Sequence, residues 1–245
     1  MKITMAMVLL LVGPLTAVAA VNSQFAYDEM REEIKEMTLE NHNPSHSYKS
    51  ARKFIMQQVH IDKDKDGYFV QDVYCKIKYR RNVAPNKMPD HKHLNVEHTW
   101  PKSRFGSNKG SRKYSKQVSD LHHLFPSDSV TNSRRGSFLF SQFQNDENAL
   151  FDCPYSKKGF VDELMAYGFE PPSSHKGNVA RALFYFAVRY DKRISAHEEF
   201  ILRQWNIMDP VDTEEIERND AIESLQGNRN PFVDDSDLSA LITDF

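Results

Sequence analysis

The sequence NVEHTWPKS at residues 95–103 decides how the rest of this chain is interpreted. It places a carboxylate, Glu97, beside an imidazole, His98, and a run rich in lysine and arginine follows at once. A carboxylate is a ligand for a hard metal ion, a neutral imidazole can act as a general base, and a basic run attracts anions. The stretch therefore predicts half of a metal-dependent nuclease site, and we expect the other half near Asn132.

The composition is that of a soluble globular protein. The chain has 245 residues, of which 40% are hydrophobic and 27% charged, and this excludes a disordered or fibrous protein. The formal net charge of −2 means that a nucleic-acid ligand would need a local basic face. We find no internal repeat, low-complexity tract or linker, so the simplest expectation after the first twenty residues is a single domain over 21–245.

Residues 1–20 are typical of a secretory signal peptide. Lys2 precedes an apolar run over 5–12, and small residues at 17–20 offer a cleavage site. A retained membrane anchor is the alternative, but the run is short for a bilayer. We therefore expect a secreted or periplasmic monomer that has no contact with the membrane after cleavage.

The two cysteines, Cys75 and Cys153, both lie outside the basic run. In an oxidising compartment two thiols of one domain often pair, so we expect a disulfide; two free buried thiols are the alternative.

The spacing of apolar residues and the positions of capping and turn residues predict mostly helices. Apolar spacing and capping residues predict helices over 25–39, 47–59 (with Ser45 or Ser47 as N-cap), 130–135, 178–190, 196–206 and 211–225, the last ending at Gly227. Alternating or β-rich composition predicts strands over 69–77, 94–100 and 119–125, with a turn at 126–128. The expected fold is α+β, a mostly helical single domain around a small antiparallel sheet.

The segment from Asp62 to Asp72 matches the first half of an EF-hand calcium loop, with three alternating aspartates before Gly67. The twelfth position is Val73, where a bidentate glutamate is expected. An acidic turn is therefore favoured over a Ca²⁺ site. A zinc site using His91, His93 and His98 is a further alternative, but the spacing is not that of a structural zinc site.

A basic segment over residues 102–116 directly follows Glu97-His98 and contains no acidic residue. Such a run is usually a solvated loop, but its position here favours phosphate binding. The basic residues expected to contact nucleic acid include Lys102, Arg104 and Lys113.

Hydrolysis of a phosphodiester by water needs a base, a cation and a clamp on the backbone. His98 can be the base, and Glu97 and Asn132 can supply oxygen ligands to Mg²⁺ or another divalent cation. Arg112 can hold a phosphate through its planar fork. Because successive side chains on a strand point to opposite faces, Glu97 and His98 can reach one phosphate only if the strand ends or twists at His98.

Three motifs, EHTWPKSRFG, SDLHHLFPSD and TNSRRG, resemble the endonuclease I family of exported bacterial nucleases, which belong to the ββα-metal or His-Me finger class. The resemblance continues in KGNVARALFYFAVRY at 176–190 and QGNRNPFVDDSDL at 226–238.

The resemblance implies a ββα-metal core at about 94–137 and roles for particular residues. His98 would be the general base, Glu97 and Asn132 the ligands of one divalent metal, and Arg112 and Arg135 contacts to the phosphate and nucleic acid. It also implies cleavage of DNA, with RNA as an open alternative, with little sequence preference and with 5′-phosphate ends. Some members carry an acidic residue just before the Ser-Asp of the second strand, where this chain has Val118.

Other residues near the motifs are interpreted as supporting. Asp120, His122 and His123 are expected to orient the site through hydrogen bonds, and Trp100 to lie in the core rather than stack on a base. A secreted protein that binds polyanions without cleaving them is the competing function, and a calcium-stabilised extracellular domain is a third.

Overall fold

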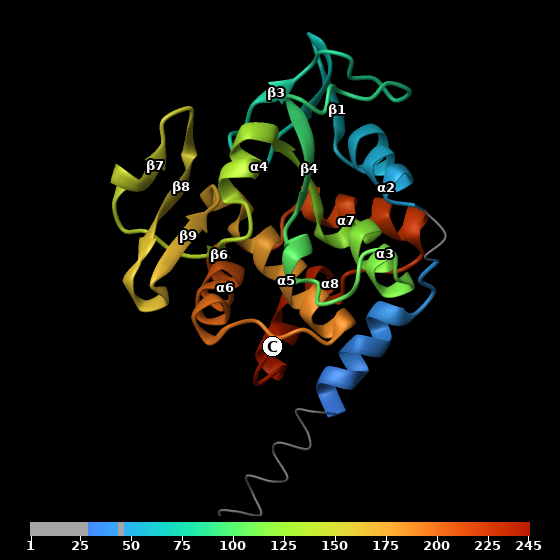
Figure 1. Cartoon of the computed structure of the whole chain (residues 1–245). Coiled ribbons are helices and arrows are strands. Elements are labelled where there is room, and N and C mark those ends of the chain that lie inside the picture. Colours follow the sequence, from blue (N-terminus) through green and yellow to red (C-terminus); the bar gives the residue numbers. More distant parts are fainter. Residues whose placement is uncertain (1–28, 44–46) are drawn as a thin grey trace, which may run out of the picture.

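The computed structural model describes residues 29–43 and 47–245 (Figure 1). The expected signal peptide lies outside the described residues, as does the first part of the helix expected over 25–39. Residues 29–39 are helical, as expected. In the described ranges no helix is both long and apolar enough to cross a membrane.

The core is built around α5 (Lys176–Tyr190), which confirms the helix expected over 178–190 and lies at the centre of Figure 1. Apolar side chains occur on every side of this helix, and all of its residues except Asn178 are buried. Trp100 is in the core as expected, stacked on Phe186 with ring centroids 5.1 Å apart. The protein combines helices with small sheets, as expected, but α5 rather than a sheet lies at its centre, because a helix that is apolar on all sides is buried most completely when other elements enclose it.

The other helices pack around α5 and the sheets. Ser47 is the N-cap of α2 and Gly227, with φ of 89°, ends α7, as the sequence predicted. The α-helices are α2 (Tyr48–Phe54), α3 (Arg112–Ser119), α4 (Ser129–Arg135), α6 (Ala196–Met208), α7 (Thr213–Gln226) and α8 (Pro231–Asp234). A π-helical turn at Ile55–Val59 extends α2, and 3₁₀ turns lie at Lys102–Arg104, Leu121–His123, Asp146–Asn148, Asp162–Leu164, Ser173–His175 and Ser236–Leu241.

Within the described residues the strands form three small sheets instead of one. The first is β1-β2-β3, the second is β4-β5, and the third has the order β6-β9-β8-β7 with β6 and β9 parallel. The third sheet falls in residues 138–175, for which the sequence predicted no regular element. The strands are β1 (Ile61–Asp64), β2 (Gly67–Gln71), β3 (Lys78–Tyr79), β4 (Leu94–His98), β5 (Leu124–Asp128), β6 (Leu139–Phe140), β7 (Ala149–Leu150), β8 (Cys153–Val161) and β9 (Ala166–Glu170).

The segment from Asp62 to Asp72 is a β-hairpin, so the acidic turn is the better interpretation of this sequence. Asp64 is paired with Arg80 at 2.6 Å, while the Asp72 carboxylate accepts the backbone N–H groups of Tyr74, Cys75, Ile77 and Asp128. Both carboxylates therefore have protein partners. The bonds to Asp72 also fold the chain back after β2, which is why the strand expected over 69–77 ends at Gln71.

Two antiparallel strands and a helix follow one another around the opening motif. In the β4–β5 ladder Glu97 lies opposite Phe125 and His98 opposite Leu124, and α4 starts directly after β5 with Asp128 as its N-cap. The expected strand over 119–125 was misplaced. Asp120 caps a 3₁₀ turn at 121–123 through the His122 N–H, so the strand begins only at Leu124.

Cys75 and Cys153 form the predicted disulfide, with their Cα atoms 4.8 Å apart. It joins the turn after β2 to the start of β8, so it links the first sheet to the third across 78 residues of sequence. Both residues are buried, and Cys75 Sγ also lies 3.1 Å from Thr131 Oγ1 in α4.

Buried histidines make the fold sensitive to acid. Burial lowers the pKa values of His122 and His123 to about 4, and that of His175 to about 3. These rings are therefore neutral in the folded protein at neutral pH.

We expect the free energy of unfolding to fall as pH decreases from about 7.5 to about 5.5. An unfolded histidine takes up its proton near pH 6.5, but these folded rings do so only near pH 4 or below, so stability is complete above about pH 7.5 and is lost progressively as the pH falls through 6.5. The loss at about pH 5.5 is on the order of 1.4 kcal/mol for each ring. Urea unfolding monitored by circular dichroism checks this, with exposed His93→Gln as the control that keeps the slope. A constant free energy of unfolding over this range would contradict it.

Candidate functional site

A cavity of about 560 Å³ lies at the end of β4 and brings together residues that are distant in sequence. It contains Glu97, His98 and Asn132, together with Lys102. The wall is formed by α2, β4, the loop after β4, and α4 with the residues that follow it: Tyr48, Arg52, His91, Asn95, Val96, Glu97, His98, Pro101, Lys102, Ser103, Asn132, Gly136 and Ser137. We call this cavity the β4 pocket.

The end of β4 explains how neighbouring residues share one pocket. Side chains on a regular strand alternate between faces, but β4 stops at His98 and Pro101 follows. Glu97 and His98 are only 2% and 5% exposed, yet both line the β4 pocket. The strand therefore ends at His98, as it must if Glu97 and His98 are to reach the same phosphate.

Glu97 is held on one of its oxygens. Tyr74 Oη donates to Oε1 at 3.0 Å, and Arg135 Nη1 lies 3.1 Å from the same atom. Burial raises the pKa of the Glu97 carboxyl, and the positive charge of Arg135 opposes that rise. The two contacts fix the plane of the carboxylate and leave Oε2 outside both of them.

Arg135 is inside the protein rather than at its surface. Its side chain is 1% exposed, it donates to the backbone carbonyl oxygens of His98 and Thr99 at 3.3 and 2.7 Å, and it lies over the Phe140 ring at 4.6 Å. The expected contact with nucleic acid is not supported by this position, because the guanidinium is already surrounded by protein. Arg135 instead forms an ion pair with Glu97 inside the protein.

His98 has a defined tautomer. Its Nε2 lies 3.1 Å from the Val118 carbonyl oxygen, and since a carbonyl can only accept, Nε2 carries the proton and Nδ1 keeps the lone pair in the neutral ring. Burial, with His123 and Lys102 nearby, lowers the pKa of His98 well below its ordinary value. The neutral ring is therefore the form present at neutral pH.

Asn132 is oriented by a second asparagine that the sequence did not single out. Asn132 lines the pocket, and its Nδ2 donates to Asn95 Oδ1 at 2.7 Å, so the amide oxygen of Asn132 takes no part in this bond. Asn95 is two residues before Glu97 on β4, so the spacing of a strand places both on one face. That periodicity was the signal by which Asn95 could have been found.

The basic residues divide into two groups. Lys102 lines the β4 pocket, with Nζ 5.9 Å from the centre of the Tyr48 ring, and so does Arg52, which the sequence did not indicate. Arg52 is one helical turn after Tyr48 on α2, so both reach the same wall.

The remaining predicted cations lie outside the wall of the pocket. Arg112 and Lys113 are exposed in the first turn of α3, so the segment expected to be a loop is partly helical. Arg104 is paired with buried Glu198 at 2.9 Å and stacks over Trp100. Arg104 therefore has a structural partner, whereas Arg112 and Lys113 remain open to solvent.

Asp120, His122 and His123 form a buried layer behind the pocket. Asp120 Oδ2 accepts hydrogen bonds from Tyr185 and Tyr190 at 2.9 and 2.8 Å. His122 Nε2 donates to the Asn228 carbonyl oxygen, and His123 Nε2 to that of Gln117. The His123 ring is 5.3 Å from the His98 ring.

The donors in the β4 pocket fit a hard divalent cation. The carboxylate of Glu97 and the amide oxygen of Asn132 are both oxygen ligands, and each has its other polar atom held by a neighbour. Among the described residues no group of three or more His, Cys, Asp and Glu side chains is placed to hold a metal ion. A cation that keeps several waters, such as Mg²⁺, needs only one or two protein ligands.

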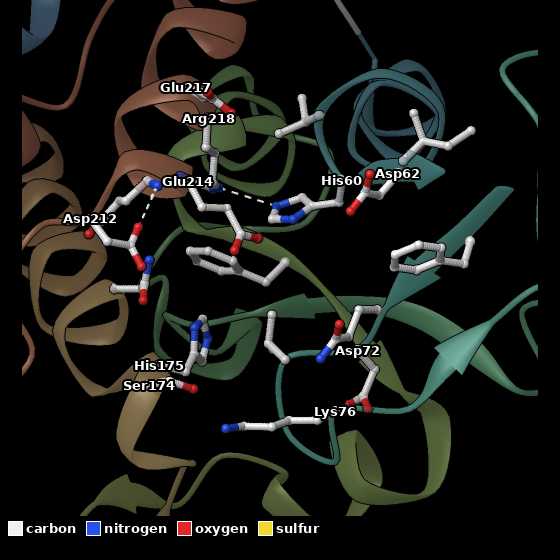
Figure 2. Close-up of a pocket in the computed structure, with 18 residues that line it drawn as sticks. His60, Asp62, Asp72, Lys76, Ser174, His175, Asp212, Glu214, Glu217 and Arg218 are labelled. Atoms are coloured by element: carbon white, nitrogen blue, oxygen red, sulfur yellow. Dashed lines mark hydrogen bonds between the residues drawn. The ribbon is translucent and has the colours of Figure 1, made fainter. Parts of the chain in front are cut away.

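A second cavity, of about 480 Å³, lies between α7 and the first sheet and has a different character (Figure 2). Asp62, Asp212, Glu214 and Glu217 line it, and Arg218 donates to His60 across its upper part at 3.3 Å. Burial raises the pKa of Glu214, and Asp212 and Asp62 add to that rise. A wall with so many carboxylates repels phosphates, so of these two cavities the β4 pocket is the better site for a nucleic acid.

Comparison with known proteins gives one family. The family model of Endonuclease I matches residues 27–237. An extracellular ribonuclease of Bacillus subtilis (strain 168) is 36% identical over 160 residues, 57% of this chain and 50% of that protein. A periplasmic deoxyribonuclease of Aeromonas hydrophila is 30% identical over 151 residues, 56% of this chain and 62% of that protein. Endonuclease-1 of Buchnera aphidicola subsp. Acyrthosiphon pisum (strain APS) is 31% identical over 186 residues, 71% of this chain and 70% of that protein.

The chain thus spans between half and 62% of the length of the Bacillus and Aeromonas proteins. The family match, in contrast, includes every residue of the β4 pocket and most of the chain. The chain therefore belongs to the Endonuclease I family.

Proposed function

We propose that this chain is an exported, metal-dependent endonuclease that hydrolyses phosphodiester bonds of DNA, and of RNA as a further substrate, with little sequence preference. The observation that carries the proposal is the meeting of Glu97, His98 and Asn132 in one pocket that also contains Arg52 and Lys102. The names of relatives, which include deoxyribonucleases and a ribonuclease, support both classes of substrate.

His98 is the general base in this proposal. With Nε2–H donated to Val118, the lone pair of Nδ1 is available to take a proton from water. The water oxygen bonds to phosphorus as the bond from phosphorus to the 3′ oxygen breaks, and the released 3′ oxygen takes a proton from solvent, so the products are a 5′-phosphate and a 3′-hydroxyl. The lowered pKa of His98 keeps the ring unprotonated before the reaction.

Glu97 and Asn132 would hold the divalent cation, with Mg²⁺ as the first candidate. When bound, the cation supplies positive charge that stabilises the phosphate as negative charge builds up on it. The contribution of the chain is to orient the two oxygen ligands, through Tyr74 and Arg135 for Glu97 and through Asn95 for Asn132.

The cations would hold the substrate backbone at different places. Arg52 and Lys102 are in the wall of the β4 pocket and suit the phosphate that is cleaved. Arg112 and Lys113, exposed on α3, suit neighbouring phosphates of the same substrate. Contacts to phosphates alone carry no sequence information, in keeping with low sequence preference.

We further infer that β4, β5 and α4 are a ββα-metal motif within a single domain over residues 21–245. Export is inferred from the sequence of residues 1–20, from the disulfide, and from relatives named as extracellular or periplasmic.

We expect His98→Ala to lower the rate of plasmid nicking by about 10²- to 10⁴-fold, because the general base is lost. Gel assays with Mg²⁺ measure this rate, EDTA should abolish nicking, and exposed His93→Ala is the matched control with full activity. Intact nicking by His98→Ala would refute the assignment. Salt-sensitive binding without nicking by the unmodified protein would instead favour a polyanion-binding protein.

We expect Tyr74→Phe to fold normally. Its affinity for Mg²⁺ and its rate of DNA cleavage should each be about tenfold lower, because one of the two contacts that orient Glu97 is removed. Calorimetric titration with Mg²⁺ and nicking at increasing Mg²⁺ concentrations measure the effect, and excess metal should restore part of the rate. Tyr79→Phe removes a similar bond, to Asp128, and should leave metal affinity unchanged. Equal Mg²⁺ affinity in Tyr74→Phe and the unmodified protein would contradict the role of Tyr74.

A further inference from the structure

The third sheet presents aromatic side chains to solvent. Phe160 on β8 and Tyr167 on β9 are 50% and 51% exposed, and they are direct partners in the antiparallel ladder, so both lie on one face of the sheet. Phe138, which precedes β6, lies next to Tyr167, with ring centroids 5.9 Å apart. These rings and Lys158 form what we call the aromatic platform.

Lys158 places a positive charge among the rings. Its Nζ lies 4.5 Å from the centre of the Phe138 ring and 5.7 Å from that of Tyr167. The centroids of Phe160 and Tyr167 are 5.7 Å apart and their planes are nearly perpendicular, so the two rings do not cover each other face to face. Lys158 therefore covers part of Phe138 and Tyr167, and the exposed parts of Phe160 and Tyr167 are available to a ligand beside this cation.

The aromatic platform continues from the β4 pocket along the chain. Gly136 and Ser137 line that pocket and Phe138 is the next residue. The Arg135 guanidinium over the Phe140 ring also holds α4 against β6, and Figure 1 shows the third sheet beside α4. Residues 136–138 therefore connect the wall of the pocket directly to the platform.

A ligand that matches this surface has flat rings that alternate with negative charges. Single-stranded nucleic acid has this chemistry, since its bases stack on aromatic side chains while its phosphates pair with cations. In a duplex the bases are already stacked on one another and cannot lie on Phe160 or Tyr167. Asp162 and Glu163, in the turn after β8, repel phosphates and limit the platform at that end.

We propose that the aromatic platform binds unstacked bases of a single-stranded substrate next to the site of cleavage. The inference rests on the proposed nuclease function and extends it, because it gives the enzyme a second contact that only single-stranded RNA or DNA can use.

Binding is measured in EDTA, where no cleavage is expected, by fluorescence anisotropy of a short labelled thymidine strand. Removal of one stacking ring, in Phe160→Ala or Tyr167→Ala, should weaken binding about tenfold. Tyr155→Ala is the matched control, because Tyr155 is 55% exposed on the same strand but lies beside Lys76 rather than the platform. This control should bind as the unmodified protein does.

A second probe separates base stacking from charge. An abasic strand of the same length carries the same phosphates, so the unmodified protein should prefer the thymidine strand, and Tyr167→Ala should reduce that preference about tenfold. Binding of a duplex should be equal in all these proteins.

Equal affinities of Phe160→Ala, Tyr167→Ala and the unmodified protein for the thymidine strand would overturn the proposal, and so would an equal loss in Tyr155→Ala. If these variants instead lost self-association in sedimentation while binding the strand normally, the platform would be a contact between copies of the chain. These outcomes leave the nuclease assignment intact, which fails only if the unmodified protein cleaves no nucleic acid with Mg²⁺.

Discussion

The site depends on keeping one carboxylate charged inside the protein. Removal of a carboxylate from water costs several kcal/mol unless a partner compensates, and Glu97 is 2% exposed. Arg135 supplies the opposite charge at 3.1 Å and Tyr74 a hydrogen bond at 3.0 Å. Because Arg135 also donates to the carbonyl oxygens of His98 and Thr99, the same ion pair attaches α4 to the end of β4. The position of Asn132 on α4 relative to Glu97 therefore depends on this pair.

A second layer of buried polar groups supports the first. Asp120 accepts from Tyr185 and Tyr190 of α5, and Gln226 Nε2 donates to its other oxygen. Arg218 of α7 donates to the carbonyl oxygens of Leu121 and Leu124, on both sides of the histidine pair. Buried groups that satisfy one another in this way allow little adjustment, so they fix where His123 lies behind His98. The QGNRNPF stretch at residues 226–232 is far from the β4 pocket in sequence. It belongs to this buried layer through Gln226, which binds Asp120, and Asn228, which binds His122.

Local patterns predicted the elements whose causes are local. The helix over 178–190 followed from its apolar residues, Ser47 and Gly227 from capping chemistry, and the disulfide from the number of cysteines and the expected compartment. The errors occurred where distant residues compete with local preference. β5 starts later than its composition suggests because Asp120 caps a 3₁₀ turn, and β2 ends early because Asp72 binds four backbone N–H groups. The two outer strands of the third sheet were not predicted because they have only two residues each and are stable only when paired.

The sequence by itself determined the reactive groups: a carboxylate beside an imidazole, an asparagine downstream and a basic segment, in an order that resembles one nuclease family. Only the tertiary structure decided which of them meet. It places Asn132 with Glu97 and His98, adds Asn95, Arg52 and Tyr74, buries Arg135 and leaves Arg112 on the surface of α3. The physical reason is that residue type sets what a side chain can do chemically, whereas burial, partner and direction come from strands and helices that are distant in the chain. Arg135 and Arg112 are the same residue type in the sequence, and only the fold shows that the first is buried and the second exposed.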